Sequence, residues 1–141
     1  MKFRILTLSL ITVAVLCTPL VFAQRGGGYR NHAPIYDPKT ETTVKGTVDE
    51  VKQYPGNGNS SGIDLMLKTS EKTIDVRVGP TWFLSQQQIE FTKGNEIEVT
   101  GSKTKVNAKD ALIAREIKKD GKVVTLRNAQ GVPQWAGNHS Q

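Results

Sequence analysis

The sequence has few of the side chains on which protein chemistry usually depends. Its 141 residues include one cysteine and two histidines. The cysteine, Cys17, lies in an apolar N-terminal segment, and the histidines are His32 and His139. A metal site needs several converging ligands, and neither histidine has a second ligand at a suitable spacing. We therefore predict no metal site and no cofactor.

The sequence also shows no serine nucleophile with a histidine placed to act as its base. Ser60, Ser61 and Ser85 have no histidine on a predicted strand or helix that could activate them. The glycines at 26–28 are followed by no Lys-Ser or Lys-Thr pair, so they do not form a phosphate-binding loop. We predict that the protein is not an enzyme.

The N-terminus has the layout of a secretory signal peptide. Lys2 and Arg4 precede an apolar run over residues 5–17, and Val-Phe-Ala at 21–23 places small or aliphatic residues where a signal peptidase cleaves. An uncleaved membrane anchor is the alternative, but the hydroxyl side chains and Pro19 disfavour a spanning helix. We predict cleavage after Ala23, a periplasmic or secreted protein, and no transmembrane segment in the mature chain.

Cleavage would leave 118 of the 141 residues, enough for one modest hydrophobic core and without any cysteine. Loss of Lys2 and Arg4 lowers the formal charge from +6 to +4. The remaining charges alternate in sign along the predicted strands, which is typical of a solvated surface and not of a nucleic-acid footprint. Composition divides the mature chain into a flexible Gly-rich tail at 24–39, a folded domain at 40–127 and a C-terminal tail at 128–141.

Alternating apolar residues predict five or six short strands in this domain. Residues 42–51 alternate, contain Gly46, and slip in register between Val48 and Val51, as expected of a sharply bent barrel strand. Residues 54–62 are predicted to be a loop, and Asp120-Gly121 is a two-residue hairpin signal. The other predicted strands cover residues 63–67, 74–78, 97–100, 111–118 and 123–127.

Gly79 and Pro80 end the third strand and predict a short helix that begins with Trp82 and Phe83. Antiparallel strands with one helix between the third and fourth follow the order of an OB-fold barrel. An SH3-like barrel would lack this helix, and a sandwich would need about seven strands. The predicted fold class is therefore all-β: a small five- to six-stranded OB-fold-like barrel.

Four segments carry a resemblance to known proteins. The stretches TVKGTVDEV, VRVGPTWFL, IEVTGSK and ALIAREIKK resemble small exported bacterial OB-fold domains, and residues 40–127 are similar in plan to the periplasmic bacterial OB-fold stress-protein family. The resemblance implies the fold and a role in the cell envelope.

The adjacent aromatic residues Trp82 and Phe83 have two interpretations. One ring is expected to fill the open end of the barrel, because a buried ring removes a large apolar surface from water. The other ring could stay exposed as a stacking surface for a sugar or a base. For a stability test we take Trp82 as the ring that fills the barrel and Trp135 as part of a looser tail.

OB-folds usually bind ligands on the outer face of the second and third strands, beside the first loop. We expect this face to present a mixture of charges and no aromatic ring, which makes nucleic-acid binding unlikely. Its expected members are Lys45, Thr47, Asp64, Met66, Lys68, Asp75 and Arg77. The candidate ligand contacts are Lys45, Tyr54, Lys68, Arg77 and Trp82.

A basic cluster occupies the last strands. We interpret it as a solvated edge that protects against aggregation, with contact to an anionic surface as the alternative. It consists of Lys103, Lys105, Lys109, Arg115, Lys118, Lys119 and Lys122.

The predicted function is a non-enzymatic binding or stress-protective envelope module whose partner is a protein, a glycan or an anionic surface. The alternative is an exported OB domain that binds nucleic acid or oligosaccharide.

Overall fold

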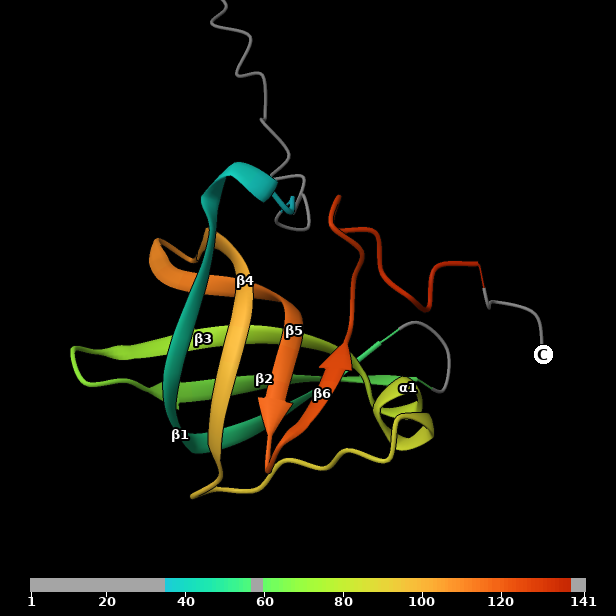
Figure 1. Cartoon of the computed structure of the whole chain (residues 1–141), viewed down its shortest axis with the longest axis horizontal. Helices are drawn as coiled ribbons and strands as arrows, with labels where there is room; N and C mark the ends of the chain where they lie inside the picture. The colour runs from blue at the N-terminus through green and yellow to red at the C-terminus, as the bar shows by residue number, and fades with distance from the viewer. Residues whose placement is uncertain (1–34, 57–59, 138–141) are drawn as a thin grey trace, which may run out of the picture. The chain divides into compact units, whose positions relative to one another are not determined.

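Six strands and one short α-helix organise residues 35–56 and 60–137, the part of the chain that the computed structural model describes (Figure 1). The predicted signal peptide and most of the Gly-rich tail lie outside these residues. No helix among them is long and apolar enough to cross a membrane. In chain order the elements are η1 (Pro38–Thr40), β1 (Glu41–Pro55), β2 (Ser61–Lys68), β3 (Thr73–Pro80), α1 (Thr81–Gln86), β4 (Glu96–Val106), β5 (Lys109–Lys119) and β6 (Lys122–Thr125).

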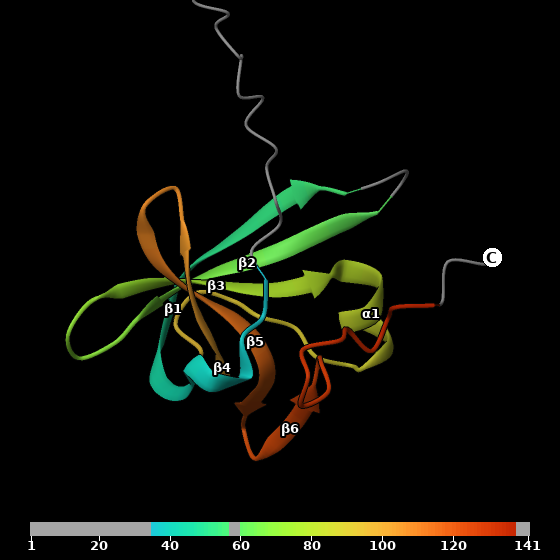
Figure 2. The ribbon, with the colours of Figure 1, turned by 90° about the horizontal axis from the view of Figure 1, so that it is seen from above.

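The first five strands close into a barrel. Their order is β3-β2-β1-β4-β5, and a parallel pairing of β3 with β5 joins the two ends of the sheet. β6 continues the sheet beyond β5, and α1 lies between β3 and β4 in sequence (Figures 1 and 2). The structure therefore confirms the predicted fold class, a five-stranded OB-fold barrel with one additional strand.

β1 is long because it pairs with two neighbours in turn. Residues 41–47 pair with β4 and residues 47–55 pair with β2, with a bulge between Val48 and Glu50. The bulge confirms the predicted register slip. Gly46 lies at the bend, where a Cβ atom would come within 2.5 Å of the Lys68 carbonyl oxygen and 2.8 Å of Leu67 Cγ. A side chain at Gly46 would therefore collide with β2 at the point where β1 changes partner.

The core fills the barrel interior with the inward residues of all five strands. Val48, Leu65, Val76, Val99 and Ile117 have no exposed surface. They alternate with more solvent-exposed residues, with the period of two that the sequence shows.

The helix closes the barrel with Phe83 and Leu84, not with Trp82. Phe83 is 6 % exposed and Leu84 is 2 % exposed, whereas Trp82 is only half-buried and meets Phe83 edge-on at 6.0 Å between ring centroids. The choice of Trp82 as the filling ring was therefore wrong. Successive residues of a helix point in directions about 100° apart, so only one of two adjacent rings can face the barrel axis.

The segment after β6 packs back on the barrel, contrary to the looser tail expected for Trp135. The Gln134 amide donates to the Leu126 carbonyl at 2.9 Å. The Trp135 ring lies 5.2 Å from the Phe83 ring and rests on Gly79, where a Cβ atom would be 2.5 Å from Trp135 Cη2. Trp135 thus covers the barrel end that Phe83 fills.

Several predicted boundaries shift once the strands pair. β1 continues to Pro55 and β2 begins at Ser61, so the first loop is shorter than predicted. β4 continues past Gly101 through a bulge and reaches Val106. The Asp120-Gly121 hairpin is confirmed, with φ values of 50° and 77° that suit the type I′ turn.

Candidate functional site

The structure separates the five residues that the sequence singles out as ligand contacts. Lys45 and Lys68 line one pocket, which we call the charged basin. Tyr54 and Arg77 line a second one, which we call the arginine pocket. Trp82 lines neither of these two pockets. The five candidate contacts therefore do not form one site, although the register places Asp64, Met66, Asp75 and Arg77 beside one another on β2 and β3 as expected.

The change of partner along β1 explains the separation. Lys45 precedes the bend and stands opposite Glu98 of β4, while Tyr54 follows the bend and stands opposite Gly62 of β2. An outward side chain before the bend therefore points to a different side of the barrel from one after it. The alternation in the sequence shows that both are outward and does not show that β1 changes its pairing partner between them.

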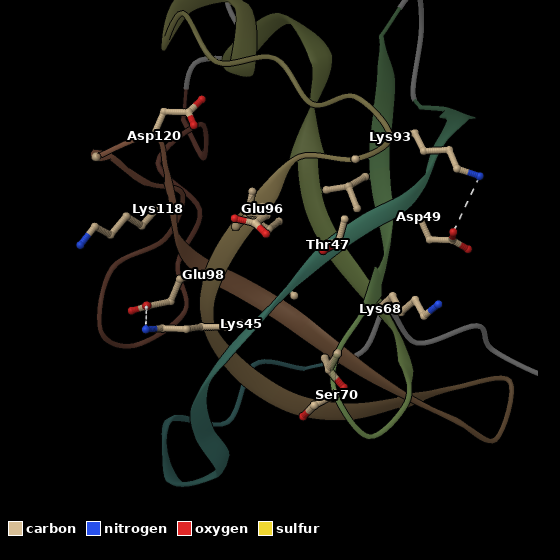
Figure 3. A pocket seen from close by; sticks show the side chains of 16 residues that line it. Lys45, Thr47, Asp49, Lys68, Ser70, Lys93, Glu96, Glu98, Lys118 and Asp120 are labelled. Atoms are coloured by element: carbon tan, nitrogen blue, oxygen red, sulfur yellow. Dashed lines mark ion pairs between the residues drawn. The ribbon is translucent and has the colours of Figure 1, made fainter.

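The charged basin is an open hollow of about 980 Å³ over the bend of β1 (Figure 3). Its floor is formed by residues 46–48 and by the neighbouring part of β4 around Ile97. Three turns supply its walls: residues 68–70 after β2, residues 93–94 before β4, and residues 118–121 between β5 and β6. Each turn carries one lysine into the lining.

Backbone hydrogen bonds hold the turn before β4 against the floor. The Val48 amide donates to the Asn95 carbonyl at 2.8 Å, and the Gly94 amide donates to the Val48 carbonyl at 2.7 Å. The Asn95 side chain accepts from the Thr92 amide at 2.8 Å. The wall that bears Lys93 is therefore fixed to the bulge of β1.

Two exposed ion pairs cross the basin surface. Lys45 Nζ lies 3.3 Å from Glu98 Oε2, and Lys93 Nζ lies 3.8 Å from Asp49 Oδ1 (Figure 3). The lysine side chains of these pairs are 81 % and 78 % exposed. Pairs this exposed contribute about 0–1 kcal/mol, so a partner with charges of its own could replace them at little cost.

Four other charged groups of the basin remain unpaired. Within residues 35–56 and 60–137, neither Lys68 nor Lys118 forms an ion pair, and neither do Glu96 and Asp120. Figure 3 shows Lys68 and Lys118 toward opposite sides of the pocket. The lining thus offers free charges of both signs.

The outer face of β2 and β3 carries a row of alternating charge. Lys52, Asp64 and Arg77 stand opposite one another across β1, β2 and β3. Burial raises the pKa of Asp64 to about 6, although Arg77 opposes this shift. Oδ1 of Asp64 and of Asp75 and Nε of Arg77 are buried without a hydrogen-bond partner. This face therefore carries charged side chains that form no ion pair with another described residue.

Sequence reasoning assigned Tyr36, Lys93 and Arg127 to no site, and it placed Lys118 in the basic cluster and not beside Lys45 and Lys68. Lys93 and Lys118 join the basin, and Tyr36 and Arg127 join the arginine pocket. Each of these four residues comes from a segment next to a turn or a chain end. Their meeting depends on barrel closure, so spacing along the chain could not have revealed it.

No group of three or more histidine, cysteine, aspartate or glutamate side chains that could hold a metal ion occurs within the described ranges.

Barrel and pockets together define a small OB-fold domain whose outer surface carries the charged basin and the arginine pocket. The chain belongs to the MamS/MamX magnetosome protein family, whose family model matches residues 40–124. The resemblance to the periplasmic bacterial OB-fold stress-protein family was thus correct for the OB-fold and wrong for the family.

Among solved structures, a chain of the S. pombe Stn1-Ten1 complex is similar to this protein. The TM-score is 0.44 and the sequence identity 16 %, over 62 % of this chain and 71 % of that chain. Comparison with curated protein sequences found no match.

Proposed function

We propose that this protein is a non-enzymatic binding module of the cell envelope that docks another protein in the charged basin. The observation that carries the proposal is the presence of unpaired lysines and unpaired carboxylates in one open hollow. Complementary charges of both signs are typical of protein surfaces, where they guide association and set the orientation of the partner.

The balance of charge favours a protein over a nucleic acid. The basin lining contains four lysines, Lys45, Lys68, Lys93 and Lys118, and four carboxylates, Asp49, Glu96, Glu98 and Asp120. A polyanion would be attracted by half of these groups and repelled by the other half. Nucleic-acid sites instead combine a positive groove with stacked aromatic rings, and among the described residues no aromatic ring lines the basin.

The shape of the basin favours a macromolecular partner over a small ligand. Pockets for small molecules are mostly apolar and enclose most of the ligand. The basin is open, and its walls are three turns that carry long, exposed lysine side chains. A protein segment could lie across the bend of β1 and exchange the two exposed ion pairs for contacts of its own.

Site-specific photo-crosslinking in envelope preparations tests this proposal. A photoreactive residue at Lys68 or at Lys118 should capture the same protein, because the two positions lie on opposite sides of one basin. The matched control is Gln86, which is exposed on α1 and outside the basin lining. A capture pattern that is identical at all three positions would refute a specific basin interface.

Charge-reversal variants distinguish specific docking in the basin from nonspecific electrostatic attraction to the whole protein. We expect Lys68→Glu combined with Lys118→Glu to abolish the crosslink from a probe at Lys93. Lys52→Glu combined with Lys109→Glu makes the same change in net charge outside the basin and should leave the crosslink intact. Equal losses in both double variants would contradict the proposal.

Fluorescence anisotropy with a single-stranded oligonucleotide tests the alternative. We expect weak binding that disappears near physiological salt, because nonspecific phosphate contacts weaken steeply as salt rises. Salt-tolerant, submicromolar binding would instead support a nucleic-acid-binding OB domain.

A further inference from the structure

The arginine pocket is a separate hollow of about 250 Å³ on the outer side of the seam between β3 and β5. Arg77 and Gly79 of β3 and Ile113 of β5 form its base. The segment before η1 contributes Tyr36, and the segment after β6 contributes Arg127. The pocket therefore forms only when the segment before η1 and the segment after β6 both pack on the barrel.

Two tyrosine rings line the pocket, and each packs closely on a glycine. A Cβ atom on Gly62 would lie 2.2 Å from Tyr54 Cζ, and one on Gly131 would lie 2.3 Å from Tyr36 Cγ. The Tyr36 hydroxyl donates to Glu41, which also accepts two hydrogen bonds of 2.8 Å from Arg115. Glu41 is thus already occupied by its neighbours.

Arg127 is a buried cation that makes no direct ion pair with a carboxylate, although the charge of Asp64 acts on it from a distance and raises its pKa. It is 9 % exposed, and in the described part of the chain it forms no ion pair. Its Nη1 donates to the carbonyls of Val78 and Ala114, and its guanidinium carbon lies 4.9 Å from the centre of the Trp135 ring. Burial lowers its pKa to about 10, so it stays charged at neutral pH. A buried charge normally has a counter-charge beside it.

Arg77 adds a second unpaired cation to the same pocket. It stands opposite Asp64 in the β2–β3 pairing, yet the two form no ion pair, and Asp64 does not line the pocket. Arg77 Nε is buried without an acceptor. The Tyr54 hydroxyl has no hydrogen bond to any other described residue, although its ring lines the pocket. The pocket thus contains two guanidinium groups and one free hydroxyl donor.

We propose that the arginine pocket binds a phosphate group, either as inorganic phosphate or as the end of a phosphomonoester, between Arg77 and Arg127. Such a group carries a charge of about −1.5 to −2 at neutral pH, which matches two unpaired cations better than a carboxylate does. Guanidinium groups offer directed N–H donors to its oxygens, and Tyr54 can donate a further hydrogen bond. The volume is below the range of about 300–1,000 Å³ typical of drug-sized ligands, so it suits one compact group. This inference concerns a surface other than the basin and does not depend on the proposed function.

Calorimetric titration of the purified protein at constant ionic strength tests the proposal. Three probes separate the sources of the group: inorganic phosphate, glycerol 3-phosphate and dimethyl phosphate. We expect one site per chain for inorganic phosphate or glycerol 3-phosphate, and the tighter of the two identifies the source. Dimethyl phosphate has a single negative charge and should bind more weakly. Absence of one-site binding by both dianions, or equally tight binding of dimethyl phosphate, would overturn the proposal.

Arg77→Gln is the decisive variant because it removes one cation from the outer face and leaves the core intact. We expect it to weaken the tighter dianion by about tenfold or more, equivalent to about 1.4 kcal/mol. Lys52→Gln removes the same charge from the same row, outside the pocket, and should change the affinity by less than about twofold. Equal weakening by both variants would show a general charge effect and refute the site.

NMR shifts of backbone amides locate the bound group without any variant. Perturbation should concentrate at Val78, Gly79 and Gly131 in the arginine pocket and spare Gly94 in the basin. Perturbation centred on Gly94 would place the anion among the basin lysines and contradict the assignment.

Discussion

At the end of the barrel, the burial of one aromatic residue of α1 leaves the adjacent aromatic residue partly exposed. Phe83 and Trp82 are adjacent on α1, and only Phe83 reaches the core. Trp82 is partly buried against the edge of the core, and Trp135, in the segment after β6, covers Phe83. The two tryptophans therefore flank a buried phenylalanine.

Replacement of Phe83 by alanine should destabilise the protein more than replacement of Trp82. We expect Phe83→Ala to lower the free energy of unfolding by about 3–5 kcal/mol, because it leaves a cavity under Trp135. Trp82→Ala should cost less, about 1–2 kcal/mol, because part of that ring is already in water. Urea denaturation measures both, since Trp135 remains as a fluorophore in each variant. A larger loss in Trp82→Ala than in Phe83→Ala would contradict this assignment.

At the scale of the elements, strand pairing places charged groups where the strands themselves cannot neutralise them. β2 and β3 bring Asp64 opposite Arg77 without an ion pair, while the β4–β5 hairpin holds Asp110 between Lys72 and Lys105. The two carboxyl groups consequently shift in opposite directions. The pKa of Asp64 rises to about 6 mainly because of burial, and the pKa of Asp110 falls to about 2 because the two lysines donate to it.

These opposite shifts predict opposite pH dependence in two matched variants. A raised pKa means that the folded state binds the proton more tightly, so the contribution of Asp64 to stability is lost as pH rises from about 4 through about 6. Asp64→Asn should therefore stabilise the protein relative to wild type more at about pH 7.5 than at about pH 4. Asp110→Asn should instead destabilise the protein at about pH 7.5 and at about pH 4, and this loss should shrink as pH falls from about 4 toward about 2. Urea midpoints at about pH 7.5, 4 and 2.5 test both variants, and an Asp110→Asn loss that does not shrink below about pH 4 would contradict the prediction.

At the scale of the whole molecule, closure of the barrel creates both candidate sites. The basin joins three turns that are far apart in sequence, and the arginine pocket joins β1, β3 and β5 to segments from both ends of the described chain. Loss of one strand pairing would therefore disturb both sites. The two sites share no lining residue, so the proposed protein partner and the proposed anion would not compete for the same side chains.

The whole chain also carries a prediction about its processing. The charged start, the apolar run and Val-Phe-Ala at 21–23 predict that the mature protein begins at Gln24 and is recovered from the periplasm or the medium. Intact-mass measurement of the protein from its native host is the direct test. A mass that still includes Met1, or that includes an acyl group, would contradict cleavage after Ala23.

Local signals in the sequence were enough to predict the succession of strands along the chain, the helix after Gly79-Pro80, the bend of β1 and the Asp120-Gly121 hairpin. Each of these features follows from local causes: the period of two in a strand, the fixed backbone angle of proline and the positive φ of a two-residue turn. Tertiary structure alone decided that Phe83 is buried in place of Trp82, that Trp135 packs on the barrel, and that Lys45 and Arg77 belong to different sites. Those outcomes depend on which face of α1 points toward the barrel axis. They also depend on which distant segments come together when the barrel closes. Alternation distinguishes inside from outside, but the position of a residue around the barrel is set only when β3 pairs with β5.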